Sequence, residues 1–339
     1  MKYGIAAVGA LVAALMLVGA GFADTLPEGP GLAAKHPGDV GLDQNPSVIV
    51  YENFEEGSLE ALAAAPSSRT VTGKRWTDLA GATGEGKTLS IVSDPPQVHS
   101  GKYGLEVLVN ESSAESGGLF ARLKPGYDQL YGRFYIKFDR DYPYESHTGL
   151  ALDATNEDAA WPIGKAGIVP KGDERFGGTL EPEPGDWKAP PGFWCFYVYW
   201  HEMKGNYGNV FQSDPPTPVA RDQWICCEMM FKANSKPEAH DGECAYWIDG
   251  KLRYHGTGFN WRTADNLKLN AVNLLHYMNK AGEAWSKYPG ARRQWFDDVV
   301  IATEYIGPLT KPGAQEVGAG PVAVKDVAQR ADWRKGEKR

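Results

Sequence analysis

The chain has 339 residues and a formal net charge of −8 at pH 7, which is unevenly placed. Residues 311–339 hold seven basic and four acidic residues and Lys2 adds one more positive charge, so residues 24–310 carry −12. An acidic body argues against nucleic acid as a partner, and against a polyanionic substrate unless a local basic patch overrides the mean field.

The first 23 residues predict a signal peptide. Lys2 precedes an apolar run that ends in small residues, and cleavage is expected after Ala23. The run is short and rich in Gly and Ala, which does not favour a permanent membrane span, although an uncleaved anchor is the alternative. We therefore expect a secreted or periplasmic protein with no membrane contact after cleavage.

The next residues, 24–46, are rich in Pro and Gly, lack periodicity and predict an extended leader. Short β-like runs follow, each bounded by Gly, Pro, Asp or Ser clusters, and Asp249-Gly250 between two of them is a strong hairpin signal. A short helix is expected at 58–65. The predicted strands cover residues 47–52, 88–93, 103–109, 118–123, 129–138, 193–203, 224–232, 243–248, 251–255, 267–277 and 294–302.

Residues 139–191 show little periodicity and predict a long loop, which in a compact domain is usually functional or disordered. Its aromatic residues and cations favour an ordered cover. Residues 311–339 predict a weakly ordered tail. Many short strands with regular turn signals indicate one all-β domain over residues 47–310, an antiparallel sandwich or barrel with no ordinary amphipathic helix.

The segment 193–203 is the most informative stretch of the sequence. Alternate strand residues share a face, about 6–7 Å apart, so one face carries only apolar side chains and the other a row of two phenols and an imidazole. Phenols and imidazoles stack on sugars, form hydrogen bonds to them and move protons. The alternative is that these are ordinary half-buried sheet residues. The apolar face holds Trp194, Phe196, Val198 and Trp200, and the other holds Cys195, Tyr197, Tyr199, His201 and Met203.

The four cysteines, Cys195, Cys226, Cys227 and Cys244, leave the redox state open. Export permits disulfides, and one of the adjacent pair could join Cys244 across a hairpin. Burial as free thiols is the alternative. A zinc site is a poor explanation because the sequence holds no CxxC pair.

Several further motifs occur in a fixed order along the chain. Together they resemble the concanavalin A-like jelly-roll polysaccharide lyases, the group of alginate and glucuronan lyases, over about residues 45–310. The motifs specify the fold better than the reaction, because lectin-like modules share this architecture. They are YGRFYIKF (131–138), HTGL (147–150), KAG (165–167), the aromatic strand, QWICCEMMFKANS (223–235), DGECAYWIDGKLRY (241–254) and RRQWFDDVVIATEYIGP (292–308).

The resemblance implies a curved antiparallel β-jelly-roll sandwich with a groove for a chain of sugars. In such lyases one group neutralises the C5 carboxylate of a uronate, a base removes the C5 proton, and an acid protonates the leaving O4. The catalytic candidates are Tyr197, Tyr199 and His201, with His147 and Lys165 assisting. His147 stands where the family's G-G-K-L-P-G-L loop has its Lys, which leaves the base unassigned.

The family's Ser-x-Arg is absent from the aromatic strand, so Arg133 and Arg175 are alternatives for neutralising the carboxylate. Glu228 either binds sugar hydroxyls or pairs with Lys232 or Arg253, because a carboxylate is not buried unpaired. His276 and Asn279, near the end of a late strand, complete the predicted substrate-binding set. His276 and Tyr277 point to opposite faces, so only one is expected to share the groove.

In similar jelly rolls the first and last strands often meet around a structural calcium ion. Asp298 with Glu52 or Glu55 supplies the carboxylates that calcium prefers. The alternative is that Asp297 and Asp298 pair with neighbouring arginines. No organic cofactor is expected, since the Gly-rich stretches lack a strand–turn–helix context.

These observations predict an exported lyase that cleaves a uronic-acid-containing polysaccharide by β-elimination. The main alternative is a non-catalytic, lectin-like carbohydrate-binding module with the same aromatic groove, and a structural cell-surface protein is a third. A glycoside hydrolase is disfavoured because it needs two carboxylates at a set separation, and no E-x-D-x-x-E arrangement occurs.

Overall fold

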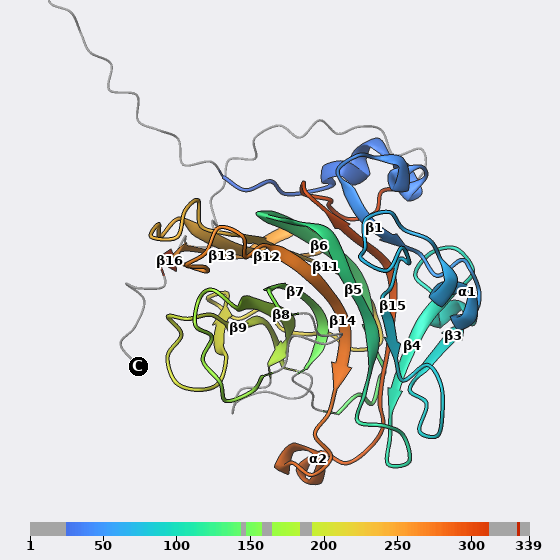
Figure 1. Cartoon of the computed structure of the whole chain (residues 1–339). Coiled ribbons are helices and arrows are strands. Elements are labelled where there is room, and N and C mark those ends of the chain that lie inside the picture. The colour runs from blue at the N-terminus through green and yellow to red at the C-terminus, as the bar shows by residue number, and fades with distance from the viewer. Residues whose placement is uncertain (1–24, 144–146, 158–164, 184–191, 312–330, 333–339) are drawn as a thin grey trace, which may run out of the picture.

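A computed structural model describes residues 25–143, 147–157, 165–183, 192–311 and 331–332. The predicted signal peptide and most of the predicted tail lie outside these residues. The described chain forms two β-sheets packed face to face, and Figure 1 shows their strongly bent strands lying one over the other. The prediction of an all-β, antiparallel jelly-roll sandwich is confirmed; the short β16 is the one parallel partner among the described strands.

We call the larger sheet the back sheet and the smaller one the front sheet. Two short helices, α1 (Leu59–Ala64) and α2 (Glu283–Lys287), lie outside them. The back sheet runs β16 (Ala331–Asp332), β13 (Lys251–Phe259), β12 (Gly242–Ile248), β11 (Trp224–Lys232), β6 (Gln129–Phe138), β15 (Arg292–Ala302), β4 (Gly104–Val109) and β3 (Leu89–Val92), and β1 (Val48–Glu52) also pairs with β15. The front sheet runs β10 (Asn209–Gln212), β9 (Phe193–Tyr199), β8 (Arg175–Glu183), β7 (Thr148–Thr155), β14 (Leu269–Tyr277), β5 (Ser116–Tyr127) and β2 (Asp78–Ala80).

The core lies between the two sheets. The apolar face predicted for β9 is buried there, as Trp194, Phe196 and Val198 are fully inaccessible to solvent. The back sheet meets them with side chains such as Phe231, whose ring centroid lies 5.2 Å from that of Phe196. Burying each such side chain contributes about 1.5–3 kcal/mol, so this face fixes which side of β9 turns outward.

The prediction of a long loop over residues 139–191 is wrong, because β7 and β8 lie in the middle of the front sheet. Nearly every residue of both strands is buried, so neither shows the period of two that marks a half-exposed strand. The glycines of β7 and β8 suggested turns in the sequence, but in the structure they allow neighbouring strands to pack closely. Gly177 has a φ of 146°, and a Cβ there would collide with the backbone and with the Asp153 carboxyl group.

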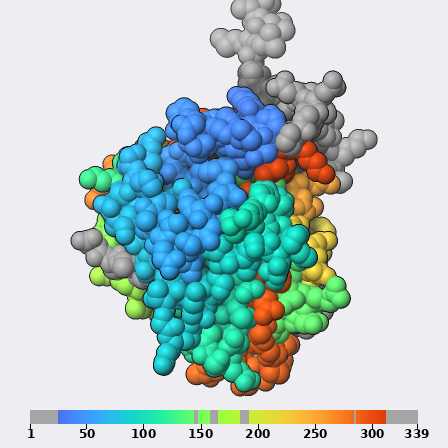
Figure 2. Space-filling model, turned by 90° about the vertical axis from the view of Figure 1, so that its right-hand side faces the viewer, coloured from blue at the N-terminus to red at the C-terminus, as the bar shows by residue number. Residues whose placement is uncertain are grey.

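The prediction of an extended leader is also wrong. Residues 31–44 form three 3-10 turns, η1 (Gly31–Lys35), η2 (Pro37–Asp39) and η3 (Leu42–Gln44), whose side chains Leu32 and Leu42 are buried in a second apolar cluster. Figure 2 shows this blue segment packed on the fold beside the red C-terminal residues. The backbone NH groups of Leu32 and Ala33 donate to the carbonyls of Tyr305 and Ile306.

Two residues that the sequence suggested for substrate binding are engaged by segments packed on the back sheet, Arg133 by the N-terminal segment and Glu228 by residues 306–307. Arg133, on β6 of the back sheet, is fully buried and forms an ion pair with Asp39. Glu228, on β11, accepts hydrogen bonds of 2.8 Å from the backbone NH groups of Ile306 and Gly307. Arg133 therefore holds Asp39 to the back sheet, and Glu228 holds Ile306 and Gly307 to it.

The Asp249-Gly250 hairpin between β12 and β13 is confirmed, with φ values of 52° and 73° that suit its tight turn. All four cysteines are buried free thiols. Cys244 pairs in register with Phe231, four residues along β11 from Cys227, so the suggested disulfide does not form. Within the described ranges, no helix is long and apolar enough to cross a membrane.

Candidate functional site

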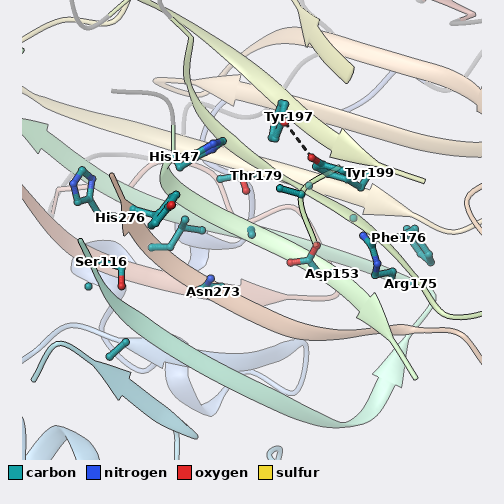
Figure 3. A pocket seen from close by; sticks show the side chains of 18 residues that line it. Ser116, His147, Asp153, Arg175, Phe176, Thr179, Tyr197, Tyr199, Asn273 and His276 are labelled. Atoms are coloured by element: carbon teal, nitrogen blue, oxygen red, sulfur yellow. Dashed lines mark hydrogen bonds between the residues drawn. The ribbon is translucent and has the colours of Figure 1, made fainter. Parts of the chain in front are cut away.

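A pocket of about 470 Å³ opens on the outward face of the front sheet (Figure 3). Strands β7, β8, β9 and β14 supply most of its wall, and His147, just before β7, closes one side. The polar side chains that line it are Asp153, Arg175, Thr179, Tyr197, Tyr199, Asn273, His147, His276, Tyr277 and Ser116.

Strand register explains why these side chains meet. Asp153 on β7 is paired with Gly177 on β8, which is paired with Tyr199 on β9. Two residues further along the strands, Thr179 of β8 is paired with Ala151 of β7 on one side and with Tyr197 of β9 on the other. Residues directly opposite each other share a face, so two rows of side chains cross the sheet and point into the pocket.

Tyr197 and Tyr199 form a pair on the pocket face of β9. Their hydroxyl oxygens lie 3.2 Å apart, and the Gly208 backbone NH donates to the Tyr197 oxygen at 3.1 Å. Burial and the bond to Tyr199 raise the pKa of Tyr197 above its ordinary value. Tyr197 therefore stays protonated at neutral pH. Each phenol carries one O–H, so one O–H of the pair remains available after the other has donated within it.

His147 lies between these phenols and a buried carboxyl group. Its Nδ1 is 3.2 Å from Oε1 of Glu181, on the pocket side of β8, and its ring centroid is 5.3 Å from that of Tyr197. Burial raises the pKa of Glu181 to about 7, against the opposing effect of His147. The ring of Tyr277 stacks on that of His147, with ring centroids 6.0 Å apart.

Arg175 and Asp153 occupy the other end of the pocket. The guanidinium carbon of Arg175 lies 5.7 Å from the Tyr199 ring centroid, and its Nη2 donates to the Ile168 carbonyl at 2.6 Å. Burial raises the pKa of Asp153 to about 8, although Arg175 opposes this. At pH 7 Asp153 is therefore mostly neutral, and the charge of Arg175 is left uncancelled.

Besides Arg133 and Glu228, three further predicted site residues do not line the pocket. His201 follows the end of β9, and its Nε2 pairs with Oδ1 of Asn260 at 2.9 Å. Lys165 forms an ion pair with Glu157. Asn279 lies in the turn after β14, where its side-chain oxygen accepts from a backbone NH at 3.0 Å.

His276 and Tyr277 both border the pocket, which the sequence did not predict. Alternation turns them to opposite faces, so His276 is almost fully buried while Tyr277 is 40% exposed. Burial lowers the pKa of His276 to about 3, helped by the positive charge of Arg292. The His276 imidazole is therefore neutral at physiological pH.

Among the polar residues that line or flank the pocket, Asp153, Thr179, Glu181, Asn273 and Ser116 were not predicted. The first three lie on β7 and β8, which the sequence suggested were loop. Asn273 had a usable signal, because it lies two residues before Leu275 and four before Tyr277 in a predicted strand. Its side-chain oxygen is buried and has no hydrogen-bond partner within the described ranges.

The three carboxylates suggested for calcium each have protein partners. Glu52 accepts a hydrogen bond from Arg75 at 2.8 Å, and Glu55 accepts from two backbone NH groups. Asp298 lies 2.6 Å from Nδ1 of His99. In the part of the chain that the structure covers, no group of three or more His, Cys, Asp or Glu residues is arranged to hold a metal ion.

Comparison with known proteins identifies the fold. No family model matches the sequence, and no curated protein matches it. The alginate lyase Aly36B matches with a TM-score of 0.51 and 14% identity over 76% of this chain and 97% of its own. A variant of Aly36B in complex with alginate tetrasaccharide matches with a TM-score of 0.51 and 12% identity, over 85% of this chain and 100% of its own. The endo-β-1,4-glucuronan lyase from the fungus Trichoderma reesei matches with a TM-score of 0.44 and 15% identity, over 76% of this chain and 95% of its own.

Identities this low show the fold alone. The resemblance that the sequence motifs indicated is thereby confirmed at the level of architecture: the chain shares its jelly-roll fold with an alginate lyase.

Proposed function

We propose that the protein is an exported polysaccharide lyase that cleaves a uronic-acid-containing glycan by β-elimination. The observation that carries this proposal is the content of the pocket: a hydrogen-bonded phenol pair, an imidazole and a guanidinium face one cavity of about 470 Å³. The signal-like N-terminus supports export, and the fold shared with Aly36B supports a polysaccharide substrate.

The first requirement of the reaction is to neutralise the uronate carboxylate, so that the C5 proton becomes acidic. Arg175 supplies a positive charge at one end of the pocket. Asn273, whose amide borders the pocket, carries an NH2 group that supplies an additional donor. A local cation in a buried pocket acts at short range, where it outweighs the acidic mean charge of the body.

The second requirement is a base for the C5 proton. Oε2 of Glu181 accepts from Nδ1 of His147 at 3.4 Å, so in the neutral imidazole Nε2 is the ring nitrogen without a proton. We assign the proton abstraction to His147. The electron pair of the C5–H bond then forms the C4–C5 double bond, and the C4–O4 bond breaks.

The third requirement is a proton for the leaving O4. The phenol pair holds one O–H that is not used within the pair, and a phenol of raised pKa remains a donor at neutral pH. We assign this step to Tyr197 and Tyr199 acting together. The proton balance then closes, because His147 gains one proton and the phenol pair loses one.

The test is the ultraviolet absorbance of the unsaturated uronate produced by β-elimination. The mature protein is incubated with alginate, glucuronan, pectate, ulvan and glycosaminoglycans. A rise on one substrate that disappears in Tyr199→Phe and in His147→Ala supports lyase chemistry at this pocket. A rise that persists in both variants places the chemistry elsewhere.

A lectin-like carbohydrate-binding function is the second candidate. It is favoured by the exposed ring of Tyr277 stacked on His147 at the rim, since aromatic faces bind sugars without catalysis. Binding of a glycan with no unsaturated product, and with affinity unchanged in Tyr199→Phe, would support this function over the lyase.

A further inference from the structure

We propose that Asp153 and Arg175 together form the subsite for the substrate carboxylate, in which Asp153 acts as a carboxylic acid that donates a hydrogen bond to the ligand. This inference rests on the proposed function and deepens it, because it assigns the group that selects a charged sugar over a neutral one. Asp153 would then be a second hydrogen-bond donor beside Arg175, although an aspartate is ordinarily ionised and repels anions.

The geometry of Asp153 is the first step. It lies in the middle of β7, borders the pocket and is 8% exposed. Its Oδ2 is buried and has no hydrogen-bond partner among the residues the structure describes. The residue paired with it on β8 is Gly177, where any side chain would collide with the carboxyl group. Glycine therefore leaves the carboxyl group open to the pocket.

The charges around Asp153 are the second step. On β8 the residue opposite Asp153 is Gly177, with Tyr199 next in that row on β9. Arg175 lies two residues before Gly177 on β8, and its positive charge acts on the Asp153 carboxyl group. On the other side β14 places Ala271 opposite Asp153, and Arg122 of β5 lies beyond in that row, donating to a backbone carbonyl at 3.2 Å. No carboxylate from these elements shares the row, so burial dominates its titration and raises its pKa to about 8.

The chemistry follows from these two observations. A buried carboxylic acid has an O–H to donate, and leaving it without an acceptor costs free energy. Beside it, Arg175 presents NH donors. Two donors of this kind match the two oxygens of a uronate carboxylate, and a hydrogen bond to a charged acceptor is stronger than one to a neutral hydroxyl. Ionised Asp153 would instead repel the same ligand.

The first arm of the test needs no substrate. Carboxyl-carbon NMR of the full mature protein, with the signal assigned by its loss in Asp153→Asn, follows the protonation of this group directly. We expect a titration midpoint near pH 8. A midpoint at or below the ordinary value for an aspartate, about 4, would overturn the inference whether or not the protein is a lyase.

The second arm measures binding of alginate and glucuronan tetrasaccharides, and of the same tetrasaccharides with their carboxyl groups reduced, by calorimetry at about pH 6 and about pH 9.5. The wild-type protein should bind a charged tetrasaccharide at least about tenfold more weakly at the higher pH, where Asp153 is ionised. Asp153→Asn keeps an NH donor without a titrating group, so its affinity should change less than about threefold between the two conditions.

Asp94→Asn is the matched control, because Asp94 is an exposed carboxylate outside the pocket, and it should behave as wild type. Equal pH dependence in Asp153→Asn and wild type would overturn the subsite. So would equal binding of the reduced tetrasaccharides, or no binding of either charged one at about pH 6. A charged tetrasaccharide that binds as expected but is not cleaved would refute the lyase proposal and leave the subsite standing.

Discussion

The hydroxyl oxygens of Tyr197 and Tyr199 lie 3.2 Å apart, because the two side chains leave the same face of β9 and their rings meet edge to face. Phenylalanine at either position keeps the ring and removes one member of this hydrogen-bonded pair. We expect kcat to fall by about 10²–10⁴-fold in Tyr199→Phe and in Tyr197→Phe, with a smaller change in KM, since a proton donor acts in the transition state.

The matched control for this loss is Tyr207→Phe. Tyr207 is 67% exposed and lies outside the pocket lining, so removal of its hydroxyl should leave kcat unchanged. Steady-state kinetics on the cleaved glycan measure all three variants. Equal losses in Tyr207→Phe would mean that the tyrosine changes act on the fold and not on proton transfer.

Glu181 offers a second prediction, because it acts only through His147. In Glu181→Gln the imidazole keeps a neutral partner but loses the charged one, so kcat should fall by about tenfold or more. The ionised carboxylate is the active form, and its pKa is raised to about 7, so wild-type activity should decline as the pH falls below that value. The glutamine variant should lose this acid limb.

A second Glu–His pair on the same protein provides the control. Glu202 and His240 lie 2.9 Å apart, outside the pocket lining. Glu202→Gln makes the same chemical change and should alter neither kcat nor the pH profile. An acid limb that survives in Glu181→Gln would show that a different group controls it.

The part of the site on β9 could be predicted from sequence, because apolar and polar residues alternate along a strand that has one buried and one exposed face. Tyr197 and Tyr199 were found in this way, with Trp194 and Phe196 on the buried face. His201 was predicted to share this face but lies outside the pocket lining, because alternation does not show where a strand ends. β9 ends at Tyr199, and the next residues form a turn.

Asp153 and Glu181 could not be found, because they lie on strands buried on both faces, where alternation disappears and glycine suggests loop. A related limit explains why Arg133 and Glu228 were predicted to bind substrate although both are buried. Whether an outward-facing residue of the back sheet meets solvent depends on the segments packed over it. These are the N-terminal segment, whose 3-10 turns carry no periodic signal, and residues 306–307. Such tertiary cover is not visible in either strand alone.

The buried ion pair between Arg133 and Asp39 predicts a large effect on stability. Asp39→Asn leaves the guanidinium without its charged partner in a solvent-free site, which typically costs about 3–5 kcal/mol of unfolding free energy. Arg140→Met removes an exposed ion pair with Asp222 instead and should cost about 0–1 kcal/mol. Denaturant unfolding measures both. Similar small losses would mean that the N-terminal segment contributes little to the stability of the fold.

The raised pKa of Asp153 also predicts a pH-dependent stability, separate from any ligand. Between about pH 4 and about pH 8 the folded protein keeps a proton on Asp153 that the unfolded chain has released. The carboxyl group therefore lowers the unfolding free energy as pH rises, by about 1.4 kcal/mol per pH unit. Above about pH 8 both states are ionised and this loss reaches its limit.

Asp153→Asn has no proton to release, so its unfolding free energy should fall less steeply with pH than that of the wild type. Below the pKa of Asp153 in the unfolded chain, both proteins should be similarly stable. Above it, the unfolding free energy of the variant should increasingly exceed that of the wild type, up to about pH 8. Denaturant unfolding at several pH values measures the difference, which cancels the contributions of the other titrating groups. Asp94→Asn should run parallel to the wild type. A difference between Asp153→Asn and wild type that stays constant with pH would contradict a neutral Asp153 in the folded protein.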